Sequence, residues 1–422
     1  MRLTKLLAAT AMLMAGPALA DTTVIHAGSV IRDAGGAASG PATITVTDGR
    51  IVSIEDGTLD KPGADRTIDL SDKTVLPGLI DLHVHLSGDP GGDFWKEAVE
   101  PDEWGVVVGA KNARLTALAG FTTVREAGSA QHTAYSLRRG TAEGLIPGPR
   151  IVAAGPPLAI VGGHGDVSGF KPEINAVLTS GYTCTGPVEC AEKVRRASQN
   201  GADVIKITAT GGVLSQQGRG LEAHFTDAEM KSIADTAHSL GLKVMAHAHG
   251  ARGIEAAARA GIDTIEHGTY IDEAAARAMR ENGTILVPTL MAFQGIKDRL
   301  GQGIYSPVVE DKVRAVAPYA ESIVERARKW NVKLAFGTDA GVFDHGQNGR
   351  ELALMRKGGM SNSEALASAT TDAAAVLGLE NEIGRLAPGY SADIIAVEGN
   401  PLADVSVLEN VDFVMVRGRV IE

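Results

Sequence analysis

A phrase that recurs through the middle of the chain constrains the fold more than any other feature. Each copy is a helix-like segment ending in glycine or asparagine, followed by a short β-branched run, as in LTALAG-FTTV and AHSLG-LKVMAH. Glycine, and next best asparagine, adopts the left-handed conformation that ends a helix. The residues at this position are Gly120, Gly201, Gly241, Gly261, Gly283 and Asn331. Repeated alternation of helix and strand predicts a parallel sheet with crossover helices.

Eight strand candidates lie in this region once LIDLHVH and RIVAAG are included. Eight strands with intervening helices over about 300 residues predict an α/β fold, a closed (β/α)8 TIM barrel. We place this barrel at residues 78–383. An open doubly wound sheet is the alternative, but it typically carries an early glycine-rich phosphate-binding motif, which this sequence lacks.

The two ends of the chain have a different pattern. The stretch TITVTDGRIVSI (43–54) alternates in polarity around Asp48-Gly49, which predicts a hairpin. Near the other end, DIIAV (393–397) and DFVMVRGRVI (412–421) also resemble strands. We expect residues 21–77 and 384–422 to form one small β-sandwich domain together.

The first twenty residues have the layout of a secretory signal peptide. Arg2 and Lys5 precede an apolar stretch, and Ala18-Leu19-Ala20 supplies a cleavage site. A membrane-spanning helix is the alternative, but the apolar stretch is short and interrupted by Gly16-Pro17. We therefore expect cleavage after Ala20 and a periplasmic or secreted protein.

Cys184 and Cys190 are the two cysteines of the sequence. In an oxidising compartment we expect them to form a disulfide, which would contribute about 2 kcal/mol in the chain-entropy model. Two free thiols are the alternative. A cysteine-rich zinc site is excluded by the small number of cysteines.

The composition narrows the range of partners. The chain is 44% apolar and 22% charged, which is typical of a globular protein, and its formal net charge is −11. It has no Lys/Arg run, and only 4% of its residues are aromatic. We expect no nucleic-acid or membrane partner. The expected partner is a small-molecule substrate, and we expect the chain to form a homo-oligomer.

Polar side chains gather where the predicted strands end, which is where TIM barrels carry their chemistry. In the first strand, His83 and His85 point to the same face because side chains alternate along a strand. Further polar residues at or just after the other strand ends are Arg125, Glu126, His164, Lys206, His247, His249, His267, Tyr270 and Asp339. Neutral imidazoles together with a carboxylate suit zinc, and an incomplete ligand set leaves room for water.

Lys206 is unusual in such a set, because an ammonium would repel a divalent cation and is costly to bury unpaired. It could form an ion pair with Asp203 or Glu126. The alternative that we favour is a carbamate, formed when CO2 adds to the amine, which would be an anion able to bridge two metals. Lys206 lies in a β-branched run where a free ammonium would be poorly hydrated.

Six motifs, taken in order, resemble the amidohydrolase superfamily over nearly the whole mature chain. They are PGLIDLHVH, GADVIKI, VMAHAHG, IEHG, FGTDAG and GRLAPGYSADIIAVEGNP. The resemblance is closest to the imidazolonepropionase-like, prolidase-type branch, which includes Xaa-Pro and Xaa-Arg/Lys dipeptidases and amidohydrolases of the ochratoxin type.

The resemblance implies two divalent metal ions, expected to be Zn²⁺. His83 and His85 would bind the first, His247 and His267 the second, and carboxylated Lys206 would bridge them. His249 could instead serve as a hydrogen-bonding neighbour of the ligands.

The resemblance also assigns the chemistry. Asp339 would bind the first metal and act as base and then acid for a metal-bridging hydroxide. His164 would contact the substrate carbonyl, and Tyr270 would contact the oxyanion or a substrate carboxylate.

These roles predict a zinc-dependent hydrolase that cleaves an amide bond of a dipeptide or an N-acyl amino acid. A cyclic-amide or lactone hydrolase with the same site is the alternative, and a non-catalytic metal-binding protein is a third reading. A charged substrate terminus would need a cationic partner, for which Arg125 and Arg219 are candidates.

Overall fold

The structure, a computed structural model, describes residues 21–422 except 92–93, 131, 168 and 216–219. The predicted signal peptide and Arg219 therefore lie outside the described residues. Within the described part of the chain, no helix is both long and apolar enough to span a bilayer.

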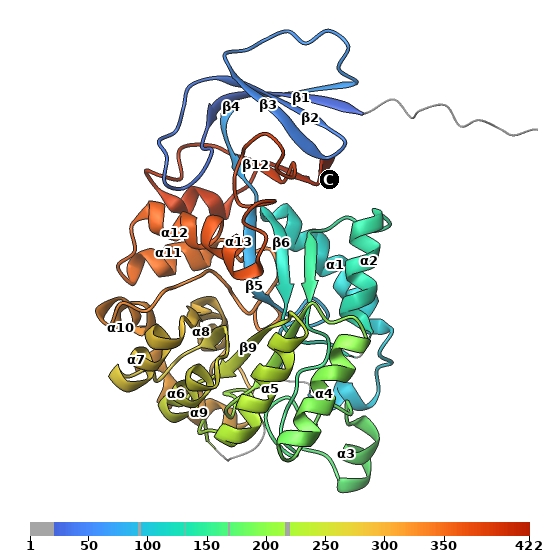
Figure 1. Cartoon of the computed structure of the whole chain (residues 1–422), viewed down its shortest axis with the longest axis vertical. Helices are drawn as coiled ribbons and strands as arrows, with labels where there is room; N and C mark the ends of the chain where they lie inside the picture. Colours follow the sequence, from blue (N-terminus) through green and yellow to red (C-terminus); the bar gives the residue numbers. More distant parts are fainter. Residues whose placement is uncertain (1–20, 92–93, 131, 168, 216–219) are drawn as a thin grey trace, which may run out of the picture.

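Strands from both chain ends form one seven-stranded sheet, drawn at the top of Figure 1 in blue and red. The order is β14-β13-β12-β4-β1-β2-β3, and the antiparallel pairing of β12 with β4 joins the two ends. The strands are β1 (Thr22–Val30), β2 (Ala42–Thr47), β3 (Arg50–Asp56), β4 (Arg66–Pro77), β12 (Ile394–Val397), β13 (Phe413–Val416) and β14 (Arg419–Val420). The expected pairing of the two ends is thus confirmed. The two layers of the predicted sandwich and the domain boundaries stay predictions.

The hairpin expected around Asp48-Gly49 joins β2 to β3, and both turn residues have positive φ, 49° and 75°. This is the backbone that a two-residue hairpin turn requires. The sheet has its own apolar core, in which Ile25 and Ile44 from the N-terminal strands meet Ile394 from β12.

The central region contains two parallel sheets, of order β5-β6-β7 and β11-β10-β9-β8. Their strands are β5 (Leu79–Val84), β6 (Phe121–Glu126), β7 (Arg150–Ala153), β8 (Val204–Thr208), β9 (Lys243–Ala248), β10 (Thr264–His267) and β11 (Ile285–Val287). All residues of β5, β6 and β8 are buried, as expected for parallel strands covered on both faces.

Isolated parallel bridges link the edges of these two sheets. Leu158 pairs with Ile207, and residues 334–340 supply the eighth predicted strand through Leu286–Leu334 and Val84–Ala340. All eight predicted strand positions therefore carry parallel pairing. This is the neighbour order that a TIM barrel requires, and closure of the barrel stays a prediction.

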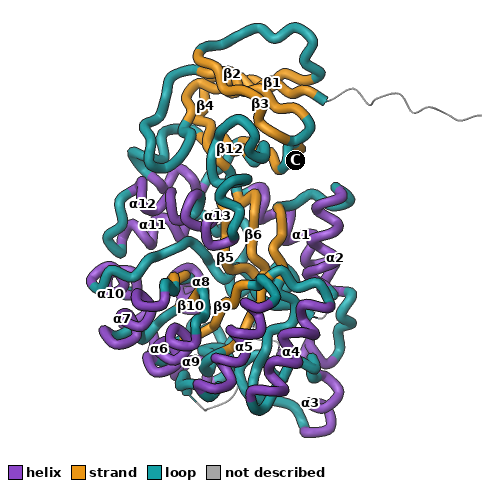
Figure 2. The backbone as a smooth tube through the Cα atoms, in the orientation of Figure 1, coloured by secondary structure: helices purple, strands orange, loops and turns teal. Residues whose placement is uncertain are grey.

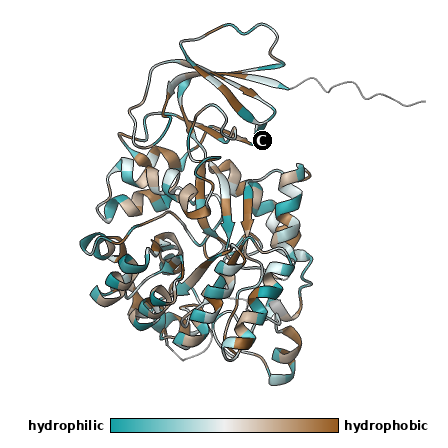
Figure 3. Ribbon diagram, in the orientation of Figure 1, coloured by the Kyte–Doolittle hydropathy of each residue, from teal (hydrophilic) through white to brown (hydrophobic). Residues whose placement is uncertain are grey.

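Helices surround these strands, as the purple and orange tubes of Figure 2 show. They are α1 (Trp104–Leu118), α2 (Thr133–Glu143), α3 (Pro172–Leu178), α4 (Pro187–Gln199), α5 (Asp227–Ser239), α6 (Ala251–Ala260), α7 (Glu273–Asn282), α8 (Leu290–Asp298), α9 (Pro307–Ala320), α10 (Ile323–Lys329), α11 (Arg350–Lys357), α12 (Asn362–Ser368) and α13 (Thr371–Leu377), with 3-10 turns η1 (Phe94–Ala98) and η2 (Val405–Glu409). In Figure 3 the helices carry both hydrophilic and hydrophobic bands, which fits one face in solvent and one on the strands.

The predicted helix ends are confirmed. The five cap glycines have φ between 73° and 98°, and Asn331 has φ 53°. A left-handed residue ends the helix and turns the chain toward the next strand. The repeated phrase therefore encodes both the end of each helix and the start of the strand that follows.

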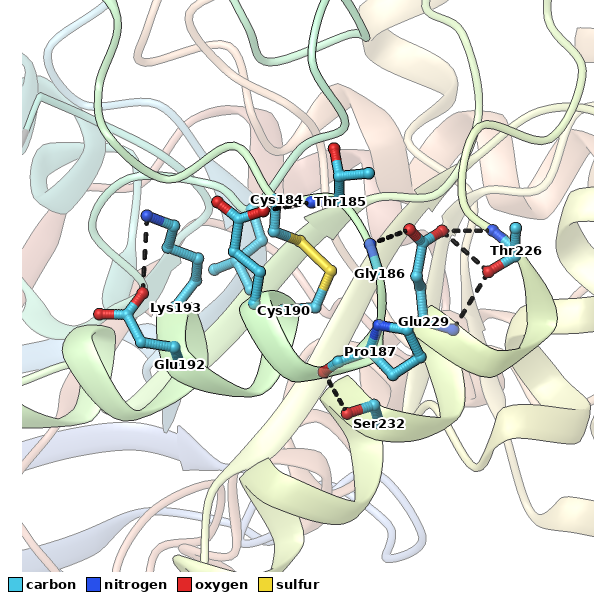
Figure 4. The surroundings of a disulfide bond; sticks show 12 residues. Cys184, Thr185, Gly186, Pro187, Cys190, Glu192, Lys193, Thr226, Glu229 and Ser232 are labelled. Carbon is cyan, nitrogen blue, oxygen red and sulfur yellow. Dashed lines mark hydrogen bonds and ion pairs between the residues drawn. A yellow bond between two sulfur atoms is a disulfide. The ribbon is translucent and has the colours of Figure 1, made fainter.

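The expected disulfide between Cys184 and Cys190 is present, with a Cα–Cα distance of 5.1 Å (Figure 4). It closes the turn that leads into α4. Glu229 on α5 accepts hydrogen bonds from the backbone N–H groups of Gly186, at 2.7 Å, and Thr226, at 2.8 Å. The disulfide loop is thereby attached to the start of α5.

Candidate active site

Side chains from several strand ends meet at one cavity of about 270 Å³. It is lined by eight of the sequence-predicted polar residues, His83, His85, His164, Lys206, His247, His249, His267 and Asp339. These residues come from β5, β8, β9, β10, the loop after β7 and the segment 334–340. The parallel order of the strands is what brings such distant parts of the chain together.

His83, His85 and Asp339 form one compact set, called here the carboxylate-backed group. Oδ1 of Asp339 lies 3.4 Å from Nε2 of each imidazole. Nδ1 of His83 lies 2.8 Å from a carboxylate oxygen of Glu266, and Nδ1 of His85 lies 2.8 Å from the carbonyl oxygen of Gly128. Because these partners bond Nδ1, both Nε2 atoms are directed toward Asp339.

His247, His249 and His267 form a second set, called here the hydroxyl-backed group. Their ring centroids are 4.6 to 4.9 Å apart. Nδ1 of His249 and Nδ1 of His267 are each 2.7 Å from a threonine hydroxyl, of Thr269 and Thr289 respectively.

The imidazole of His247 is held the other way round. Its Nε2 lies 3.2 Å from the carbonyl oxygen of Gly211, so its Nδ1 is the nitrogen left for a ligand.

Burial keeps these imidazoles neutral. It lowers the pKa of His249 to about 3 and holds the pKa of His83, His247 and His267 well below the ordinary value. Neutral imidazole is the form that binds metal.

Lys206 contacts the carboxylate-backed group and lines the same cavity as the hydroxyl-backed group. The residue is 4% exposed, and Nζ is 3.3 Å from Nε2 of His83. Within the described chain it makes no ion pair, and Asp203, one of its two expected partners, bonds Arg138 instead. Burial lowers the pKa of Lys206, which favours the neutral amine.

Two of the predicted ligands stand on backbone with positive φ, His267 at 72° and Asp339 at 61°, and so does Thr289, at 49°. Non-glycine residues rarely adopt this region, and each costs about 1–3 kcal/mol. The positive φ at His267 breaks the alternation of side chains along β10, so that Glu266 and His267 can both contribute side chains to the site. Sequence reasoning identified the histidine but not the strained backbone that directs it.

Asp81 ties the backbones of two predicted ligands together. Its carboxylate accepts hydrogen bonds from the N–H of His83 at 3.0 Å and from the N–H and hydroxyl of Thr338, which precedes Asp339. Asn348 adds a further hydrogen bond of 2.8 Å. Despite these donors, burial raises the pKa of Asp81 to about 6.

Glu266 and Arg125 form a buried ion pair behind His83, at 2.9 Å. Arg125 also donates to the carbonyl oxygen of Leu82, at 2.7 Å. Arg125 is therefore committed to the protein and is not the cation for a substrate terminus, which corrects that expectation. Glu266 was not identified from the sequence. The signal that could have found it is an acidic residue on the interior face of a predicted strand, two positions after Thr264.

His164 lies at the cavity, 4.2 Å from His247 between ring centroids. Its Nδ1 is 2.8 Å from the hydroxyl of Ser215, which leaves Nε2 free. Tyr270 is not among the described residues that line the cavity, since its ring packs on Tyr319 at 4.7 Å. Its assigned contact with substrate stays a prediction.

The donor set fits two metal ions. Each group offers three nitrogen or carboxylate oxygen atoms within 4.8 Å of one another. Neutral imidazoles whose other nitrogen is hydrogen-bonded are typical of ligands already oriented for a cation. Lys206 is buried next to His83 and forms no ion pair with the described residues.

The chain matches the model of the family described as "Amidohydrolase family" over residues 74–421. An ochratoxinase of Aspergillus niger is 33% identical over 358 residues, 79% of this chain and 72% of the relative.

Two solved structures are similar over 95% of this chain. A Xaa-Pro dipeptidase with bound methionine in its active site is 38% identical, with a TM-score of 0.86 and its whole length covered. A prolidase complexed with N-methylphosphonate-L-proline is 32% identical, with a TM-score of 0.86 and 99% of its length covered. The resemblance to the prolidase-type branch is thereby confirmed.

Proposed function

The chain belongs to the amidohydrolase family, and on this premise we propose that it cleaves an amide bond of a dipeptide or an N-acyl amino acid with two bound Zn²⁺ ions. Its relatives establish a hydrolytic enzyme that acts on amide bonds of a small molecule. The printed names of the similar proteins, a Xaa-Pro dipeptidase, a prolidase and an ochratoxinase, support this choice of substrate.

One observation carries the proposal. Two sets of three ligand atoms face a single cavity, and a buried lysine without an ion pair in the described chain stands next to them. In this assignment the carboxylate-backed group holds one metal and the hydroxyl-backed group the other. Metal in such a site polarises a carbonyl and lowers the pKa of bound water.

The protein's own groups supply orientation and proton transfer. Asp339 reaches the shared space with one carboxylate oxygen and takes the proton of the attacking water before delivering it to the leaving nitrogen. His164 presents Nε2 to the carbonyl oxygen of the substrate, because Ser215 occupies its Nδ1. Lys206, carboxylated by CO2, would carry a negative charge in place of the unfavourable buried ammonium and could then serve as a metal ligand.

We also propose export and assembly as a homo-oligomer. The disulfide supports export, since such bonds persist in oxidising compartments. N-terminal sequencing of the protein recovered from the periplasm or medium should begin at Asp21. Light scattering of the exported protein should give a molar mass at least twice that of one chain, and the mass of a single chain would contradict the homo-oligomer.

The test of function is hydrolysis of a library of dipeptides and N-acyl amino acids by the zinc-loaded mature protein, run beside cyclic amides and lactones. We expect cleavage of open-chain amides, abolished by chelator and restored by zinc. Asp339→Asn should lower turnover by about 10²–10⁴-fold, the range for removal of a general base. Cleavage of cyclic substrates alone would refute the substrate assignment, and full turnover of Asp339→Asn would refute the base.

A further inference from the structure

The cavity has two unlike walls. Besides the metal-binding side chains, the cavity is lined by aliphatic and aromatic residues from three consecutive helices, α8, α9 and α10, which we call the apolar wall. They include Leu290, Phe293, Ile296, Val316, Ala320 and Ile323. Phe293 and Leu290 are only partly buried, so part of each side chain remains open at this cavity.

Among the described residues that line the cavity, the formally charged side chains are Lys206 and Asp339, both in the metal-binding set. The polar side chains of the three helices are directed elsewhere. Lys297 on α8 pairs with Glu321 at 2.6 Å, and Arg326 on α10 donates to the carbonyl oxygens of Thr269 and Ile271.

Lys312 on α9 is not among the described residues that line the cavity. Its Nζ donates to the carbonyl oxygens of Gly212 at 3.0 Å and Ser215 at 2.5 Å. It therefore fixes the loop whose Ser215 hydroxyl orients His164. Leu214 of the same loop adds an apolar side chain to the cavity.

We propose that this apolar wall selects a substrate with a long aliphatic or aromatic side chain and rejects basic and acidic ones. The inference rests on the proposed amide hydrolysis and narrows it. A cavity of about 150 Å³ lined by apolar side chains accepts benzene, so one of about 270 Å³ accommodates a methionine or phenylalanine side chain. An ammonium or carboxylate at this wall would lose its hydration without gaining an oppositely charged partner among the described residues that line it.

Norleucine and lysine make a matched pair, since their side chains differ only by the terminal ammonium. We would measure kcat/KM of the zinc-loaded protein for N-acetyl-norleucine against N-acetyl-lysine, and for norleucine and lysine at each position of alanine dipeptides. Norleucine should be preferred by on the order of 100-fold at the position that enters the cavity. Equal rates for the two residues at every position would overturn the proposal.

Variants locate the preference in the wall. Phe293→Ala should lower kcat/KM for norleucine by about 10-fold or more and leave lysine unchanged. Phe293→Asp should move the preference toward lysine, and it tolerates the charge because this side chain is only partly buried. Leu145→Ala, at an exposed position that does not line the cavity, is the control. Its kcat/KM values for both substrates should equal those of the parent protein. An unchanged preference in both Phe293 variants would contradict the assignment.

A binding measurement tests the apolar selection independently of the proposed hydrolysis. Calorimetric titration with free L-norleucine and free L-lysine needs no turnover. Norleucine should bind and lysine should not, and Phe293→Ala should weaken the norleucine signal. If no amide is cleaved but this binding pattern holds, the reaction is wrong and the apolar selection stands. If norleucine does not bind, or lysine binds as tightly, the apolar selection is wrong.

Discussion

The two histidine groups of the cavity are built from similar donors but supported differently. In the carboxylate-backed group, His83 faces Glu266, which is paired in turn with Arg125, and Asp81 ties the two backbones together. In the hydroxyl-backed group, the neutral side chains of Thr269 and Thr289 fill the corresponding places. A carboxylate behind an imidazole raises its basicity as a ligand. We therefore expect the carboxylate-backed group to bind metal more tightly.

The largest loss of activity and of bound metal should come from removing Lys206, the residue proposed to bridge the two metals. Lys206→Ala deletes the proposed bridge, so the hydroxyl-backed group should lose its metal and turnover should fall by on the order of 10³-fold. Metal analysis and amide hydrolysis measure the two effects. Lys231→Ala, at an exposed position on α5, is the control. Two metals per chain in Lys206→Ala would show that the lysine does not bridge.

Glu266→Gln should sharpen the contrast between the groups. It leaves Arg125 buried without its counter-charge, which should cost about 3–5 kcal/mol in free energy of unfolding. It should also weaken metal binding at the carboxylate-backed group by about 10–100-fold. Denaturant unfolding and zinc titration test both. Glu255→Gln, which breaks an exposed pair with Arg259, should change stability by less than about 1 kcal/mol.

Thr289→Val is the matching change in the hydroxyl-backed group. It keeps the β-branched shape and removes the hydroxyl that bonds Nδ1 of His267. The variant loses a neutral hydrogen bond and no charge. Its metal affinity should therefore fall by about 10-fold, the low end of the range for removing a hydrogen-bonding partner of a metal ligand. A loss equal to that in Glu266→Gln would remove the proposed distinction between the groups.

The smallest effect on the site should come from the disulfide. Replacing Cys184 and Cys190 together by serine should lower the free energy of unfolding by about 2 kcal/mol. The loop is attached to α5 (Figure 4), and neither cysteine is among the described residues that line the cavity, so the zinc affinity of both groups should stay unchanged. Altered zinc affinity in this variant would mean that the two regions are coupled.

Local rules in the sequence predicted most of the fold. A glycine or asparagine at a helix end has one steric reason to be there, and Gly261 and Asn331 adopt the expected left-handed backbone. The sequence also has the spacing of a capping box at Thr226–Glu229 and at Ser361–Glu364, and both capping boxes are present in the structure. Strand order was then predictable, because alternating helices and strands leave few topologies.

The site was predictable where its residues lie at strand ends, and less so behind them. His83, Lys206 and Asp339 converge as expected. The pairing of Arg125 with Glu266, and the four hydrogen bonds to Asp81, join residues that are up to 267 positions apart. Such partners depend on side-chain packing across the interior, which no local pattern encodes. Tyr270 illustrates the same limit, since its ring packs on Tyr319 of α9.

Zinc titration of the metal-free protein, with amide hydrolysis followed at each addition, tests the proposed centre of two metals most directly. We expect the first equivalent to bind at the carboxylate-backed group with little turnover, and the second to restore full activity. In Glu266→Gln the affinity for the first equivalent should fall, and in Thr289→Val the affinity for the second. Full activity at one equivalent, or no dependence on metal, would contradict a centre of two metals.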